Sequence, residues 1–151
     1  MPVKTVIRNV ILADDDADDL LIFEEMLRAI DPSVKLEVVT DGQELLHLLQ
    51  NIYPDLLFLD LDMPVKNGLE CLVEIRGNER LKNLPVVVFS STTRPANIQT
   101  AYEMGAHLFL IKSPSYQEHL AAVKAILALD WSEPEEIKNQ YCVNGRYTAF
   151  S

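Results

Sequence analysis

Five short apolar runs recur along the chain, and a polar residue follows each of them. The runs span residues 10–13, 36–39, 56–59, 86–89 and 108–111, and the polar residues that follow are Asp14, Thr40, Asp60, Ser90 and Lys112. Continuous apolar runs of this length are typical of parallel strands that are covered on both faces. The pattern therefore predicts five parallel strands in one sheet.

Segments with helical spacing of apolar residues lie between and after these runs. They span residues 20–30, 45–52, 69–73, 98–102 and 120–127, and in each the apolar side chains fall on one stripe of a helix. Prolines, which break regular structure, fall between the predicted elements at positions 54, 64, 85, 95 and 114. Strands that alternate with helices in this way predict a doubly wound α/β domain.

Length and charge limit the function. With 151 residues, 48% of them hydrophobic, the chain is expected to form one domain around one core. A formal charge of -10 disfavours direct contact with nucleic acid or an anionic membrane. Cys71 and Cys142 form neither a C-x-x-C motif nor a Cys/His cluster. Since no signal peptide or bilayer-spanning stretch is recognisable, we expect a cytoplasmic protein.

Polar residues that could take part in chemistry follow four of the predicted strands. Asp14 and Asp15 follow the first run, Asp60 the third, Ser90 the fourth and Lys112 the fifth. The carboxyl ends of parallel strands lie at one edge of a sheet, and ligands of such folds bind there. We therefore expect these side chains to share one site.

The carboxylates of this edge imply a cation. Asp62 adds another acidic residue two positions after Asp60, and clustered carboxylates are unfavourable unless a cation neutralises them. Mg²⁺ suits a shallow site of carboxylates, a backbone carbonyl, water and a phosphate oxygen. For Asp16, Asp18 and Asp19, at the start of the first helix, we prefer a role in capping and in balancing the helix dipole.

Asp60 is the candidate nucleophile. A carboxylate beside a metal can attack phosphorus and form an acyl phosphate. Phosphoryl transfer depends mainly on alignment and on neutralising the phosphoryl oxygens, for which Lys112 offers a charge and Ser90 a hydroxyl. Taken singly, these two would be an ordinary strand-end lysine and a turn serine, and only their coincidence with the aspartates suggests more.

Together the motifs resemble the receiver family of response regulators over about residues 6–129. The motifs are Ile11–Asp16, Leu59–Pro64 with Gly68, Pro85–Ser91, and Lys112. The resemblance implies a flavodoxin-like (βα)5 fold with sheet order 2-1-3-4-5. It also implies a receiver domain over residues 1–129 that acts alone, like chemotaxis receivers, and signals without being an enzyme.

The resemblance also implies residue roles. Asp60 is the phosphoacceptor, while Mg²⁺ is held by Asp60, Asp15, the backbone carbonyl of Asp62 and, through water, Asp14. Lys112 is the cation of the site, and Ser90 and Phe109 are the switch residues. The implied phosphodonor is a sensor histidine kinase or histidine phosphotransfer protein. The implied output is a downstream protein that binds helix 4, strand 5 and helix 5.

Two positions depart from the family pattern. The family usually has proline directly after the lysine, often with a cis peptide bond, whereas Ser113 here separates Lys112 from Pro114. A cis bond before a residue other than proline costs about 3 kcal/mol, so we do not expect one to persist. The second departure is Phe109, which lacks the hydroxyl of the tyrosine often found at that position.

Residues 130–151 extend beyond the resemblance. They hold four of the eleven aromatic residues, namely Trp131, Tyr141, Tyr147 and Phe150. Asn144-Gly145 between strand-forming residues predicts a β-hairpin over residues 141–148. An isolated hairpin is marginally stable, so this one should dock, either on its own domain or on a partner such as a second copy of the chain; both remain open.

Two other functions fit parts of the pattern. Asp60-Leu61-Asp62 resembles the D-x-D motif of haloacid-dehalogenase-like phosphatases, but the order of the other motifs is reversed and Pro64 stands where threonine or valine is expected. A receiver that binds partners without phosphorylation is the other alternative, and the complete acidic set argues against it. The histidines, His47, His107 and His119, are expected to be ordinary structural residues outside the acidic cluster.

Overall fold

A five-stranded parallel sheet forms the centre of the protein. The computed structural model describes residues 6–151, so the start of the domain predicted at residue 1 lies outside the described residues. The strands are β1 (Asn9–Ala13), β2 (Lys35–Val39), β3 (Leu56–Leu59), β4 (Val86–Ser90) and β5 (Leu108–Ile111). They pair in the order β2-β1-β3-β4-β5, and each pairing is parallel. The predicted fold and strand order are confirmed.

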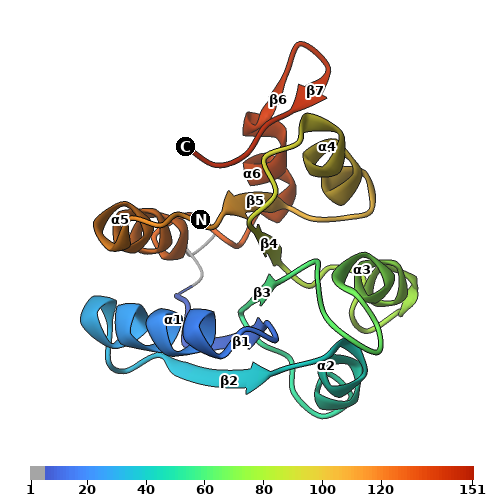
Figure 1. The fold of residues 1–151 in the computed structure, drawn as a ribbon. Helices are drawn as coiled ribbons and strands as arrows, with labels where there is room; N and C mark the ends of the chain where they lie inside the picture. The colour runs from blue at the N-terminus through green and yellow to red at the C-terminus, as the bar shows by residue number, and fades with distance from the viewer. Residues whose placement is uncertain (1–5) are drawn as a thin grey trace.

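Helices cover both faces of this sheet (Figure 1). Helices α1 (Ala17–Ile30) and α5 (Tyr116–Leu127) lie on one face, and α2 (Gly42–Leu48), α3 (Gly68–Gly77) and α4 (Pro95–Glu103) lie on the other. Each covered face is a separate apolar layer. Among the described residues, no helix has the length and apolar character needed to span a bilayer.

The strands differ in how far their residues are buried. Every residue of β3 and β4 is buried, as their continuous apolar sequences require. At the sheet edge, by contrast, β2 exposes Lys35, Glu37 and Val38. The prediction that all five runs are covered on both faces is therefore wrong for β2. Charged side chains on an exposed edge strand disfavour pairing with another chain.

Local contacts fix the turns that follow the strands. Asp16 caps α1 by accepting hydrogen bonds from the backbone N–H groups of Asp18 and Asp19, so its predicted capping role is confirmed. At the start of α3, a Cβ on Gly68 would lie 2.3 Å from the carbonyl oxygen of Asp60. Any side chain there would displace the strand end that carries Asp60, and glycine lets the helix begin against that backbone.

Residues 130–151 pack against their own domain beside β5 and α4 (Figure 1). The segment contains α6 (Pro134–Gln140), which the sequence patterns did not predict, and a hairpin of β6 (Cys142–Val143) and β7 (Arg146–Tyr147). Asn144 and Gly145 form its turn with φ angles of 52° and 77°, which Asn-Gly pairs accommodate readily. Trp131 is buried, and its indole N–H donates to the carbonyl of Ile126 at 2.8 Å.

Candidate functional site

Three carboxylates meet at the carboxyl edge of the sheet. One carboxylate oxygen from each of Asp14, Asp15 and Asp60 lies within 4.8 Å of the other two. Asp14 and Asp15 follow β1 and Asp60 follows β3, and these strands are neighbours, with Ala13 paired to Leu59. Asp14 and Asp60 are buried, whereas Asp15 is exposed. The topology thus brings together the acidic residues that the sequence placed at strand ends.

Lys112 is the cation of this cluster. Its ammonium nitrogen lies 2.9 Å from Asp14 Oδ2, 2.7 Å from Asp19 Oδ2 and 3.7 Å from Asp60 Oδ2. Its backbone N–H donates to the carbonyl of Ser90 at 2.8 Å, which ties it to the end of β4. Burial lowers the pKa of Lys112, but the hydrogen bonds to Asp19 and Asp14 outweigh it, so the pKa is raised overall. The group is therefore charged at neutral pH.

The cluster keeps an excess of negative charge. Burial, followed by repulsion from Asp14, raises the pKa of Asp60 to about 7, although the charge of Lys112 and the backbone N–H of Asp62 oppose the rise. One ammonium group therefore faces several carboxylates that are held close together. Such an arrangement attracts a further cation, because a cation favours the ionised form of Asp60.

A cleft of about 400 Å³ opens over the carboxylates and gives access to them. Its walls include Asp60, Asp62, Lys112 and Ser91. Ser90 instead is buried at the end of β4, where its hydroxyl accepts a hydrogen bond from the Thr92 N–H at 3.3 Å. Of the two successive serines, Ser91 therefore borders the open cleft, while the predicted switch residue Ser90 lies buried beside it.

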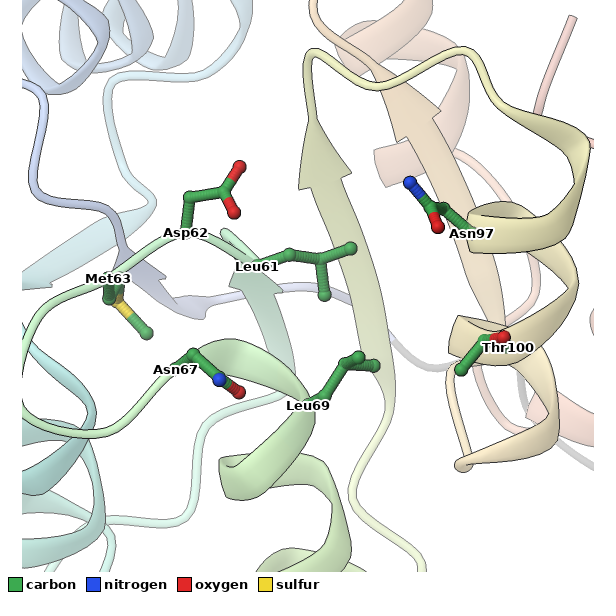
Figure 2. Close-up of a pocket in the computed structure, with 7 residues that line it drawn as sticks. All are labelled: Leu61, Asp62, Met63, Asn67, Leu69, Asn97 and Thr100. Carbon is green, nitrogen blue, oxygen red and sulfur yellow. The ribbon is translucent and has the colours of Figure 1, made fainter.

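Asp62 also borders a second hollow of about 480 Å³, between the β3–α3 loop and α4. Figure 2 shows Asn97 and Thr100 of α4 on one side of it and the loop residues Leu61, Asp62 and Met63 on the other. Apart from Asp62, none of the described residues that line it is charged. The acidic cleft is therefore the candidate site, and this second hollow is lined mainly by uncharged side chains.

The structure corrects the role assigned to Asp19. Asp19 was predicted to act in capping and in balancing the helix dipole, yet its carboxylate accepts a 2.7 Å hydrogen bond from Lys112. The two residues are 93 positions apart, and no sequence motif signals the pair. Asp19 therefore belongs to the cluster and holds the ammonium group from the side of α1.

We expect Asp19→Asn to lower the free energy of unfolding by about 1 kcal/mol, because a charge-assisted hydrogen bond to a partly exposed carboxylate is lost. Urea unfolding at pH 7 measures the change. Asp18→Asn is the matched control, since Asp18 lies in the same helical turn, is exposed and alters the helix dipole equally. Equal effects of the two variants would show that the dipole alone matters.

The two positions that depart from the family pattern, Ser113 and Phe109, have different structural consequences. No peptide bond among the described residues is cis, and Lys112 still reaches the carboxylates. Phe109 is fully buried, and its backbone N–H donates to the hydroxyl of Tyr102 at 3.0 Å. A tyrosine hydroxyl is thus present beside position 109, but α4 supplies it.

Two of the histidines, His107 and His119, are buried. Val86 N–H donates to Nδ1 of His107, and burial, then the charge of Arg76, lowers the pKa of His107 to about 3. His119 is also buried, but with Asp19 and Lys112 it lines a cavity of about 80 Å³. His119 therefore lies beside Asp19 and Lys112, but it is not part of the group formed by Asp14, Asp15 and Asp60.

The class of protein follows from a family comparison. The family model of the response regulator receiver domain matches residues 10–124. The chain therefore belongs to the response regulator receiver family, whose members are signalling proteins of two-component systems. The match includes the acidic residues, Ser90 and Lys112, and it ends before the segment of residues 130–151.

Individual relatives include both short and long regulators. Response regulator Rcp1 of Synechocystis sp. is 29% identical over 124 residues, which is 78% of this chain and 84% of Rcp1. The transcriptional regulatory protein CpxR of Klebsiella pneumoniae is 31% identical over 129 residues, which is 85% of this chain but 53% of CpxR. The chain thus matches most of Rcp1 and about half of CpxR.

Solved structures agree with the fold. The phosphorylated cyanobacterial phytochrome response regulator RcpA has a TM-score of 0.74 and 29% identity, with coverage of 80% of this chain and 91% of that one. The Mn²⁺-bound form of Rcp1 has a TM-score of 0.72 and 28% identity, with coverage of 79% and 91%. These similarities support the flavodoxin-like receiver fold.

Proposed function

We propose that this protein is a phosphoacceptor switch in which Asp60 receives a phosphoryl group from a phosphohistidine. The observation that carries the proposal is the position of Asp60. It is buried at the end of β3, within 4.8 Å of Asp14 and Asp15 and 3.7 Å from the ammonium group of Lys112. A nucleophile beside both a cation site and a fixed positive charge suits phosphoryl transfer.

The residues at this edge fit Mg²⁺. Three carboxylates in reach of one another offer the hard oxygen ligands that the ion prefers. Burial and then the charge of Asp14 raise the pKa of Asp60, and a bound cation would offset both effects. Asp15 and Asp60 would bind the ion directly, with the backbone carbonyl of Asp62, and Asp14 would bind through water. When bound, Mg²⁺ neutralises the phosphoryl oxygens and keeps Asp60 ionised. The Mn²⁺-bound structure of Rcp1 supports a metal at this edge by analogy.

Side chains of the protein carry out the remaining steps. A carboxylate oxygen of Asp60 attacks phosphorus, the phosphorus–nitrogen bond of the donor breaks, and the imidazole of the donor leaves and takes up a proton. Lys112 balances the charge on the transferred group. Ser90 exchanges its contact with the Thr92 N–H for the phosphoryl group, and this movement, with Phe109, biases the domain between two shapes.

The donor in this proposal is a sensor histidine kinase or a histidine phosphotransfer protein, and the output is a protein contact rather than catalysis. We place the downstream contact at α4, β5 and α5. Residues 141–150 lie beside α4 and β5, so a partner at this face meets the C-terminal segment as well. A second copy of the chain is the alternative partner for the same face.

Phosphorylation of the purified protein tests the proposal. With Mg²⁺ and acetyl phosphate, mass spectrometry should show one added phosphoryl group on the protein, and Asp60→Asn should abolish it. Asp62→Asn, which removes an exposed carboxylate from the same loop and leaves its backbone carbonyl in place, is the control and should retain uptake. Unchanged phosphorylation of the Asp60→Asn protein would overturn the assignment.

A further inference from the structure

The C-terminal segment is hydrogen-bonded to the backbone of the proposed switch residue. The N–H of Phe150 donates to the carbonyl of Phe109 at 2.8 Å. On its other side, the N–H of Phe109 donates to the hydroxyl of Tyr102, which in turn donates to the carbonyl of Thr148 at 2.9 Å. Both backbone groups of Phe109 are thus linked, one directly and one through Tyr102, to residues 148–150.

Side chains reinforce this connection. The ring of Tyr147 stacks on that of Tyr102 with centroids 4.6 Å apart and an angle of 14° between the planes. The backbone N–H of Tyr147 donates to the side chain of Gln99 at 2.8 Å, and Lys138 donates to the carbonyl of Tyr102 at 2.8 Å. The segment therefore contacts both α4 and β5, and Tyr102 takes part in most of these contacts.

We propose that residues 141–150 act as a built-in clamp on β5 that favours the phosphorylated state of Asp60. This inference rests on the proposed function and adds to it a regulatory element within the chain. Docked, the clamp holds Phe109 buried and β5 fixed against β4. Released, it leaves β5, whose single neighbour in the sheet is β4, without these contacts along its outer edge.

The direction of the effect follows from the position of Lys112. This residue lies three positions beyond Phe109, directly after β5, and its ammonium group must stay beside Asp60 to balance the transferred phosphoryl group. A loosened β5 holds Lys112 less firmly, so the phosphorylated state loses stabilisation. Because coupling between two sites is reciprocal, occupancy at Asp60 should also tighten the clamp.

Fluoroberyllate with Mg²⁺, a mimic of the phosphoryl group, tests the clamp in the full-length protein. Tyr102→Phe removes only the bridging hydroxyl, and Tyr147→Ala removes the stacked ring from the partly exposed hairpin. Calorimetry should show fluoroberyllate affinity reduced about fivefold or more in each variant, within the usual range of coupling between sites. In the unsubstituted protein, fluoroberyllate should slow hydrogen exchange of the amides of residues 147–150.

Tyr53→Phe is the matched control, since it removes a hydroxyl from a tyrosine that is 47% exposed in the loop before β3. It should leave both measurements unchanged. If the unsubstituted protein binds no fluoroberyllate, the proposed function itself fails. The clamp alone is refuted if the unsubstituted protein binds fluoroberyllate, both variants bind it with the same affinity, and hydrogen exchange of residues 147–150 does not change. Should Tyr102→Phe fail to fold, Tyr147→Ala and the exchange data still decide.

Discussion

Asp60→Asn is expected to stabilise the metal-free protein by about 2 kcal/mol at pH 8 and to have little effect near pH 4. Burial and the charge of Asp14 raise the pKa of Asp60 from 3.8 to about 7 in the folded state. The folded protein therefore binds a proton that the unfolded chain releases between these pH values. Stability falls as the pH rises through this window, and above pH 7 the folded state carries the full cost of the buried charge.

Asparagine removes that charge but keeps an oxygen that can accept from the Asp62 N–H, as Asp60 does at 3.3 Å. Urea unfolding in the presence of a chelator, at pH 4, 6 and 8, measures the difference between the two proteins. Added Mg²⁺ should stabilise the unsubstituted protein at pH 8 more than the variant, since the ion binds only the folded cluster. If the difference in unfolding free energy is the same at all three pH values, it does not arise from the ionisation of Asp60.

Much of the fold could be read from the sequence because parallel strands leave a clear pattern. The runs at residues 10–13, 56–59 and 86–89 are buried at every position, as their continuous apolar sequences predict. The site followed from the same pattern, since residues at the carboxyl ends of strands meet once the strands are parallel. Asp14, Asp60 and Lys112 were therefore found together without any knowledge of distances.

The parts that escaped prediction depend on side-chain direction and on contacts that are distant in sequence. Asp19 looked like a helix-start residue, and only the folded arrangement shows its carboxylate turned to Lys112. Which of Ser90 and Ser91 borders the cleft likewise depends on the direction of two neighbouring side chains. Exposure of β2 was missed for another reason: Glu37 interrupts its apolar run, and the implied strand order already placed this strand at the sheet edge.

The C-terminal segment shows a further limit. Its Asn-Gly turn was visible in the sequence, but its docking place was not, because the aromatic residues reveal a need for burial without naming the surface. Likewise, Phe109 lacks a hydroxyl, and no pattern indicates that Tyr102 places one beside its backbone. Short-range rules therefore predicted the hairpin, while its link to β5 is visible only in the folded structure.

Lys112→Met is expected to destabilise the metal-free protein by about 3 kcal/mol at pH 8, because removing one partner of a buried ion pair leaves the others uncompensated. The ammonium group is the cation that contacts Asp14, Asp19 and Asp60, at 2.9, 2.7 and 3.7 Å. Phosphorylation by acetyl phosphate should also fall by about 100-fold or more, since a fixed charge at the transferred group is lost. Lys112→Arg, which keeps the charge in a bulkier group, should lose less of both.

Combining Lys112→Met with Asp60→Asn separates the two roles of Lys112. Asp60→Asn should raise the free energy of unfolding more in the Lys112→Met background than in the unsubstituted protein. Without the lysine, nothing offsets the charge of Asp60, so removing that charge has a larger effect. Urea unfolding of the four proteins at pH 8 gives this interaction energy directly. Strictly additive effects would mean that Lys112 does not stabilise the ionised Asp60, and its proposed part in balancing a phosphoryl group at that position would lose its physical basis.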